Sequence, residues 1–125
     1  MSLLDDQLKF FQEEFPTASL TPLQDGSHVV TVPGVKLPVG WSQPQTTVKF
    51  LLLANYPHSV PDCFWVEPHI RLANGALPQN SNTQAIPGTN ETWLWFSWHA
   101  SRWNPNRDTL STYMNVIAVR LREAK

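Results

Sequence analysis

The chain has 125 residues, of which 42% are hydrophobic and 15% charged, and its formal net charge is -1. This length predicts one globular domain over residues 1–125 with one hydrophobic core, and the apolar content excludes a disordered chain. The near-neutral charge, without a basic stripe, argues against nucleic acid or an anionic membrane as a partner. Cys63 is the only cysteine, which excludes an internal disulfide and a zinc site of several thiolates.

Targeting and ligand signals are also missing from the sequence. The longest apolar run, residues 50–54, is far shorter than a membrane span. Residues 1–10 mix charged side chains with leucines, unlike a secretion signal, so we expect a soluble, cytoplasmic protein. His28, His58 and His69 lie in different segments without ligand spacing, so neither a metal site nor a cofactor is expected.

Two segments have the spacing of amphipathic helices. Residues 2–15 should form the first helix, with Ser2 as its cap and Pro16 at its end. Residues 108–123 should form the second helix, with Asp108 as its cap. The apolar positions expected to face the core are Leu4, Leu8, Phe11 and Phe15 in the first segment and Leu110, Met114, Ile117 and Leu121 in the second.

The chain between these helices predicts strands and one long loop. Asp25-Gly26 is typical of a hairpin turn between two strands, and the third strand is apolar enough to suggest burial on both faces. Residues 73–92 are polar and lack a convincing period, which predicts an irregular segment that is functional or mobile. The fold class is therefore α+β, with an N-terminal helix, a four-stranded antiparallel meander (residues 19–24, 28–32, 46–54 and 64–66), an irregular segment and a C-terminal helix.

Two motifs that contain proline lie in the segments that connect these elements. Tyr56-Pro57 and Pro61 follow the third strand, where the prolines can hold an extended turn. Trp103-Asn104-Pro105 precedes the last helix, and its tryptophan is expected to fill the gap between that helix and the irregular segment.

Together with the order of elements, these motifs resemble the ubiquitin-conjugating-enzyme superfamily. The resemblance is closest to a prokaryotic branch, family E of the bacterial ubiquitin-conjugating-like proteins, and it covers roughly residues 1–124. It implies the ubiquitin-conjugating fold. It also implies a component of bacterial ubiquitin-like operons that encode activating enzymes and metal-dependent deubiquitinase-like peptidases. The matching residues are Tyr56, Pro57, Pro61, Asp62, Arg71, Leu72, Gly75, Pro78, Trp93, Ser97, His99, Trp103, Pro105, Asp108 and Leu110.

The chain departs from this superfamily at the catalytic centre. In the enzymes, the catalytic cysteine lies about eight residues before the tryptophan of the tryptophan–proline element, a place that falls near Trp95 here. No cysteine occurs between Phe64 and Lys125. The family's asparagine, which supports the oxyanion, also has no clear counterpart, because His69-Ile70-Arg71 lacks the proline and asparagine that should follow. The resemblance therefore implies the fold and the pathway but not the usual chemistry.

Cys63 and His99 remain the candidates for catalysis. A reactive thiol needs a lowered pKa and access, whereas Cys63 lies between a carboxylate and Phe64 at the start of a strand, as expected of an inert, buried thiol. The imidazole of His99 can either bond a loop carbonyl and hold the irregular segment, or act in catalysis or in partner contact.

The candidates for binding are His99, Arg102, Trp98 and Asp62. Trp98 and Arg102 are neighbours of His99 in the chain, and Asp62 follows Pro61, where it is also expected to cap a turn. Trp93, Trp95, Trp98 and Trp103 are either core residues or an exposed platform for sugar stacking or protein contact.

These observations favour a non-catalytic interaction protein that binds a ubiquitin-like protein, an activating enzyme or an active conjugating-enzyme partner. The alternative is an active transferase with an unorthodox centre at Cys63 or His99, for which the local sequence supplies no nucleophile and base pair. A tryptophan-rich carbohydrate-binding domain is a third interpretation, and it would lead us to expect a secretion signal.

Overall fold

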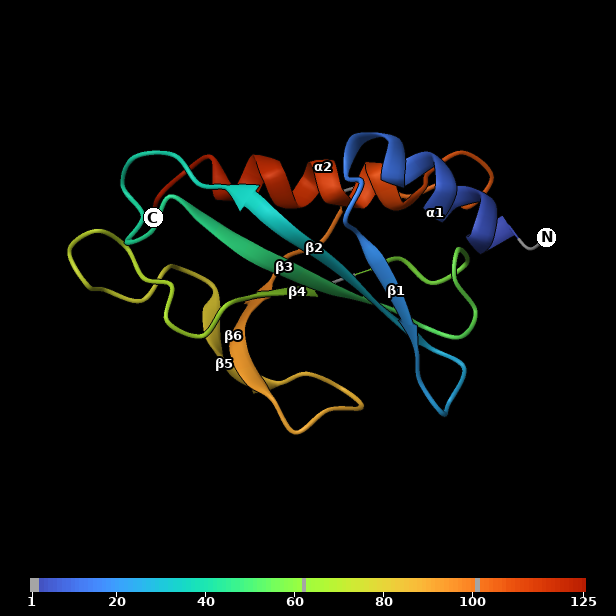
Figure 1. Ribbon diagram of the computed structural model, residues 1–125, viewed down its shortest axis with the longest axis horizontal. Helices are drawn as coiled ribbons and strands as arrows, with labels where there is room; N and C mark the ends of the chain where they lie inside the picture. Colours follow the sequence, from blue (N-terminus) through green and yellow to red (C-terminus); the bar gives the residue numbers. More distant parts are fainter. Residues whose placement is uncertain (1–2, 62, 101) are drawn as a thin grey trace.

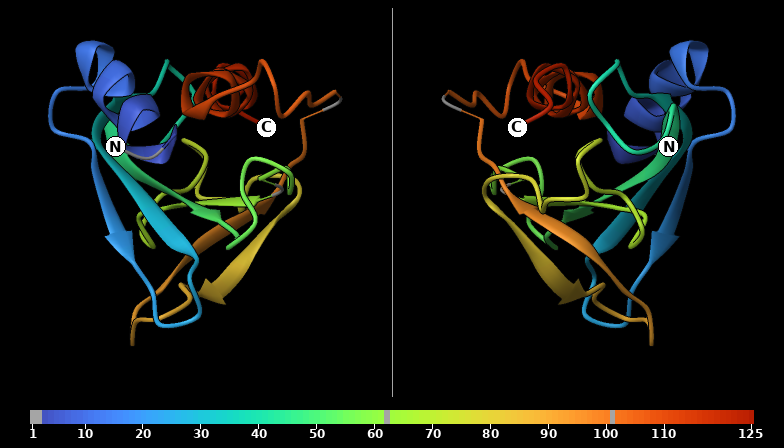
Figure 2. Two further views of the ribbon diagram at one scale, coloured as in Figure 1. Left: turned by 90° about the vertical axis from the view of Figure 1, so that its right-hand side faces the viewer. Right: turned by 90° about the vertical axis from the view of Figure 1, so that its left-hand side faces the viewer.

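A six-stranded antiparallel sheet with two helices on one side forms the framework (Figures 1 and 2). The computed structural model describes residues 3–61, 63–100 and 102–125. The strands lie in the order β1-β2-β3-β4-β6-β5, so β5 and β6 form a hairpin at the edge of the sheet. The elements are α1 (Leu3–Glu14), β1 (Ser19–Pro22), β2 (His28–Lys36), β3 (Gln45–Leu52), β4 (Cys63–Val66), β5 (Ser81–Ala85), β6 (Thr92–Ser97) and α2 (Leu110–Leu121).

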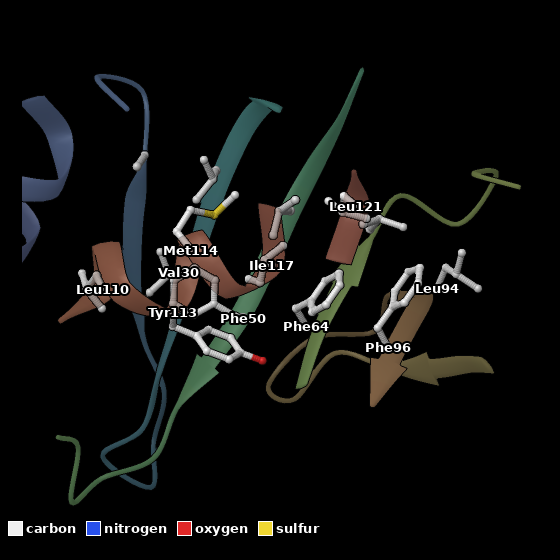
Figure 3. Close-up of a cluster of buried hydrophobic side chains, with 14 of the residues drawn as sticks. Val30, Phe50, Phe64, Leu94, Phe96, Leu110, Tyr113, Met114, Ile117 and Leu121 are labelled. Atoms are coloured by element: carbon white, nitrogen blue, oxygen red, sulfur yellow. The ribbon is translucent and has the colours of Figure 1, made fainter. Parts of the chain in front are cut away.

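The main core lies between α2, α1 and the sheet face that the helices cover. Because side chains alternate across a strand, every second residue of β2, β3, β4 and β6 points at the helices. Phe64 and Phe96 stack there with ring centroids 4.7 Å apart, and Tyr113 meets Phe50 edge-on at 5.3 Å. Figure 3 shows the buried residues of α2 facing the strands: Leu110, Tyr113, Met114, Ile117 and Leu121 opposite Val30, Phe50, Phe64, Leu94 and Phe96.

A smaller apolar cluster lies on the other face of the sheet. Val29, Trp65 and Ile86 are buried there, against partly buried Leu23, Leu51, Cys63, Trp93 and Trp95. The turn between β5 and β6 lies against the turn between β1 and β2 (Figure 2). Gly88 has a φ of +77° and allows this approach, because a Cβ atom at that position would come within 2.5 Å of the Leu23 side chain. The contact covers part of the face that lacks helices.

The hairpin of β5 and β6 corrects the expected strand count from four to six. Residues 81–85 lie inside the segment expected to be irregular, yet they pair with β6 from Ser81↔Phe96 to Ala85↔Thr92. As an edge strand, β5 is largely exposed, so its polar composition does not show the alternation that identifies a half-buried strand. The expected burial of the third strand on both faces is also wrong, because burial in β3 alternates along the strand.

The start of α2 differs from the expected one as well. Asp108 was predicted to cap this helix, but Thr109 is the N-cap, and its N–H donates to Oγ1 of Thr112 at 3.0 Å. The carboxylate of Asp108 accepts the N–H of Asn104 at 2.6 Å instead, which closes the turn before the helix. Ser2, the expected cap of α1, lies outside the described residues.

Replacement of Phe96 should be among the most destabilising changes in the core. Phe96→Ala removes a fully buried ring that stacks on Phe64, so we expect the free energy of unfolding to fall by about 3–5 kcal/mol. Phe10→Ala is the matched control, because Phe10 is 64% exposed on α1 and should change stability by less than about 0.5 kcal/mol. Urea denaturation of both variants measures the difference, and similar losses would contradict this assignment of the core.

Candidate functional site

The two proline motifs meet at one junction between the turn after β3 and the segment before α2. Nε1 of Trp103 donates to the carbonyl oxygen of Pro57 at 2.7 Å, and the rings of Tyr56 and Trp103 lie 6.1 Å apart. The Tyr56–Pro57 peptide bond is cis, and Pro57 and Pro61 are buried. Trp103 is only partly buried and packs against the main core. It therefore joins the segment before α2 to the turn after β3, and it does not simply fill a gap beside the helix.

Gln7 completes this junction from α1. The hydroxyl of Tyr56 donates to Oε1 of Gln7 at 2.6 Å, and the N–H of Leu110 donates to the same oxygen at 3.2 Å. One buried amide oxygen thus connects α1, the turn after β3 and the first residue of α2. Burial raises the pKa of Tyr56 well above its ordinary value, and the hydrogen bond to Gln7 opposes this only in part. Gln7 was not found from the sequence, although its position three residues after Leu4 places it on the inner side of the helix.

His99 lies beyond β6 at the rim of an open hollow, which Asn80, Ser97 and Trp98 also line. The backbone around it is held firmly, because Ser97 N–H donates to the Asn80 carbonyl at 3.0 Å and the Tyr113 hydroxyl donates to the Trp98 carbonyl at 2.9 Å. The imidazole itself is exposed. Among the residues that the structure describes, it has no hydrogen bond to a loop carbonyl, so the expected structural role of His99 is not seen.

Arg120 supports this segment from α2 and was not found from the sequence. Its side chain is buried, and its guanidinium lies 5.4 Å from the Trp98 ring and 5.1 Å from the Phe96 ring. Its nitrogens donate to the carbonyl oxygens of Gln79, Glu123 and Lys125 at 2.7 to 2.9 Å. Burial lowers the pKa of Arg120, and nearby Glu123 opposes the shift. The available signal was its position three residues after Ile117, on the buried stripe of the helix.

The other binding candidates do not all gather around His99. Trp98 is partly buried and Arg102 is exposed, so both can take part in a surface with His99. Asp62 lies outside the described residues, and its predicted roles in binding and in a turn stay untested. The four tryptophans form neither a core nor one platform: Trp98 and Trp103 pack on the main core, while Trp93 and Trp95 pack on the cluster across the sheet.

Cys63 lies on the face of the sheet away from the helices. It is the first residue of β4, where it pairs with Ser97, and it packs beside the tryptophan-rich cluster. The thiol is partly buried rather than fully buried as expected. Trp95, near the place of the enzymes' catalytic cysteine, lies in β6 and pairs with Trp65 on one side and with Asn82 on the other. Trp95 is thus a residue inside the sheet.

The described part of the chain meets neither the requirements of a metal site nor those of a membrane-spanning helix. No group of three or more His, Cys, Asp or Glu residues lies close enough there to hold a metal ion. Neither described helix is both long and apolar enough to cross a membrane.

A helix at the start, an antiparallel sheet and a helix behind the tryptophan–proline turn define a ubiquitin-conjugating-like protein. The sequence model of a protein family described as Prokaryotic E2 family E matches residues 4–124, and the chain belongs to this family. Comparisons with curated proteins and with solved structures found no match.

Changes at Trp103 should separate packing from hydrogen bonding at the junction. Trp103→Ala should lower the free energy of unfolding by about 3 kcal/mol, because it removes the ring contact with Tyr56 and the bond to Pro57. Trp103→Phe keeps a ring and leaves the Pro57 carbonyl unpaired, which should cost about 1–2 kcal/mol. Chemical denaturation measures both variants. A loss below about 1 kcal/mol for Trp103→Ala would mark the tryptophan as a surface contact residue instead.

The raised pKa of Tyr56 predicts a loss of stability at high pH. The folded protein keeps the phenol protonated above pH 10, where the unfolded chain loses this proton. The contribution of Tyr56 to the free energy of unfolding is therefore fully present below about pH 10 and falls as pH rises further. Tyr56→Phe should be less stable than wild type by about 1 kcal/mol at neutral pH, and the difference should shrink above pH 10. Urea denaturation at several pH values tests this, and a difference independent of pH would refute it.

Proposed function

We propose that the chain is a single-domain, non-catalytic ubiquitin-conjugating-like subunit over residues 1–125 that works in the bacterial cytoplasm. It binds a ubiquitin-like protein, an activating enzyme or an active conjugating-enzyme partner in a conjugation pathway. The observation that carries the proposal is the placement of the only thiol. Cys63 lies in a paired strand on the face away from the helices, and the family position of the nucleophile falls near Trp95, which is no cysteine.

The surroundings of Cys63 argue against thioester chemistry. A nucleophilic thiol needs a neighbouring cation or helix N-terminus that lowers its pKa, together with room for the incoming acyl group. Cys63 packs against an apolar cluster whose largest members are Trp65, Trp93 and Trp95. The start of α2 faces the other side of the sheet, where Leu110 joins the main core.

The segment around His99 is the surface that best supports partner binding. His99 and Arg102 are exposed after β6, and Trp98 packs on the edge of the main core. The Tyr113 hydroxyl donates to the Trp98 carbonyl, and the Arg120 guanidinium lies 5.4 Å from the Trp98 ring. An ordered segment loses little conformational entropy when a partner binds. Tryptophan and arginine are also enriched among residues that dominate binding energy at protein interfaces.

An active transferase with an unorthodox centre is the alternative. It would use Cys63 or His99 to carry the ubiquitin-like protein, and the exposure of His99 is the observation that favours it. Covalent catalysis requires an activated nucleophile, and His99 has no hydrogen-bonded orienting group among the described residues. We therefore place His99 in partner contact.

A conjugation assay distinguishes these two functions. The protein is mixed with the matching activating enzyme, the ubiquitin-like protein and ATP, and the products are separated without reductant. We expect no conjugate on this protein, while the thioester on the activating enzyme shows in the same lane that the reagents work. A conjugate that disappears with reductant and with Cys63→Ser would overturn the proposal. A conjugate that survives Cys63→Ser but not His99→Ala would assign the chemistry to His99.

A binding measurement tests the surface separately. The double variant His99→Ala with Arg102→Ala should weaken binding of the ubiquitin-like protein or enzyme partner at least tenfold, which corresponds to about 1.4 kcal/mol. His69→Ala is the matched control, because this histidine is also exposed but lies in the segment after β4. Equal affinities for the double variant and the control would move the binding surface elsewhere.

A further inference from the structure

The backbone of β5 is open on its outer side. β5 is the last strand of the sheet and pairs only with β6 (Figure 2). Two hydrogen bonds bound the ladder between these strands: Ser97 N–H donates to the Asn80 carbonyl at 3.0 Å, and Ile86 N–H donates to the Glu91 carbonyl at 2.9 Å. Because bonded and non-bonded pairs alternate along an antiparallel ladder, the direction of every backbone group in β5 follows from these two bonds.

Three residues of β5 direct their N–H and C=O groups away from β6. Counted from the bonds at both ends, Asn82 and Gln84 face β6, whereas Ser81, Thr83 and Ala85 face outward. A side-chain bond agrees with this assignment, because Thr83 N–H donates to Oδ1 of Asn82 at 2.8 Å. Among the described residues, the outward N–H groups of Ser81 and Ala85 find no acceptor. The edge therefore offers an added strand the carbonyls of all three outward residues and the N–H groups of two.

The opposite edge of the sheet is closed by a proline. In the ladder of β1 and β2, Leu23 N–H donates to the Ser27 carbonyl at 2.8 Å, so the same alternation directs Leu20 and Pro22 outward. Pro22 has no N–H, which leaves Leu20 as the one outward donor of β1. Natural proteins protect edge strands with proline or charged side chains, and β5 contains neither. β5 is therefore the edge at which a strand can be added.

The groups at this edge specify the chemistry of what binds there. A row of outward carbonyl and N–H groups is satisfied by another extended backbone, as in peptide recognition by strand addition. We propose that an extended segment of the protein partner adds to the sheet as a strand beside β5, an inference that rests on the proposed function. The first residue of β5, Ser81, adjoins the hollow of about 380 Å³ that Asn80, Ser97, Trp98 and His99 line. A segment paired with β5 can therefore continue onto the surface around His99.

Asn82 makes this edge more suitable for a foreign segment than for a second copy. Three outward residues with one N–H and one carbonyl each allow six bonds to an antiparallel strand. If two β5 strands paired about Thr83, the Thr83 N–H groups of both copies would lie in the contact, and Asn82 holds each of them. Two of the six bonds would then be blocked. A segment of another protein meets this block only once and can form five.

Proline at position 85 tests the strand addition. Ala85→Pro removes an outward N–H and keeps the bonds of Asn82 and Gln84 to β6. Calorimetric titration with the matching ubiquitin-like protein and, separately, with the matching activating enzyme should show binding about tenfold weaker than that of the wild type. Ala85→Val is the matched control, because it changes the same exposed side chain, keeps the N–H and should bind as the wild type does.

Two further measurements examine the same edge. Asn82→Ala frees the Thr83 N–H for the partner segment, so binding should become about twofold to tenfold tighter. Hydrogen exchange of the wild type needs no substitution. The amides of Ser81 and Ala85 should exchange more slowly in the complex, whereas the outward amide of Leu20 at the other edge should not change. If circular dichroism shows that Ala85→Pro is unfolded, exchange at Ser81 and Ala85 decides the question.

The outcomes separate this inference from the proposed function. If the wild type binds and neither Ala85→Pro nor complex formation changes the behaviour of the edge, strand addition is wrong and the proposed function stands. If neither protein binds the wild type, both fail. Equal losses for Ala85→Pro and Ala85→Val would assign the contact to the side chain and overturn the inference. A wild-type dimer in sedimentation velocity that Ala85→Pro abolishes would give the edge to a second copy instead.

Discussion

The stack of Phe64 on Phe96 determines which side of the sheet each candidate group occupies. The rings lie nearly parallel, 4° apart, on the side of the helices, and they align β4 with β6. Because successive side chains of a strand point to opposite faces, Cys63 and Trp95 must then lie on the other side. A shift of one residue in either strand would bury different side chains and expose a phenylalanine, so the alignment is strongly specified. The position of the only thiol is therefore a consequence of packing in the core.

The helix α2 controls the surface segments through polar groups at both of its ends. Tyr113 bonds the carbonyl of Trp98, and Arg120 reaches the carbonyls of Gln79 and the C-terminal residues. A buried arginine is costly unless its donors are satisfied, and here backbone carbonyls of two separate segments satisfy them. Through these bonds, the helix that fills the core also orders the loop before β5 and the segment after β6. The candidate binding surface is thus built on the core, although its residues lie outside it.

The sequence predicted the elements whose side chains alternate between core and solvent, and it failed where this alternation is missing. The two helices and the hairpin at Asp25-Gly26 follow from spacing and turn residues. The meeting of the two proline motifs was not predicted, because it joins segments far apart in the chain. The edge strand β5 was missed, because exposure of both its faces removes the apolar period. Gln7 and Arg120 were missed for another reason: each is a polar residue on an apolar stripe, and its value depends on carbonyl, amide and hydroxyl groups from distant segments.

Trp95, near the expected place of the superfamily's cysteine, is fixed within the sheet by the pairing of β6. In-register pairing with β4 on one side and β5 on the other makes β6 an interior strand, so its backbone groups are used in the sheet. A cysteine in place of Trp95 would point to the face away from the helices, toward the cluster around Trp65. The hairpin of β5 and β6 therefore holds Trp95 inside the sheet, with its side chain on the face away from the helices.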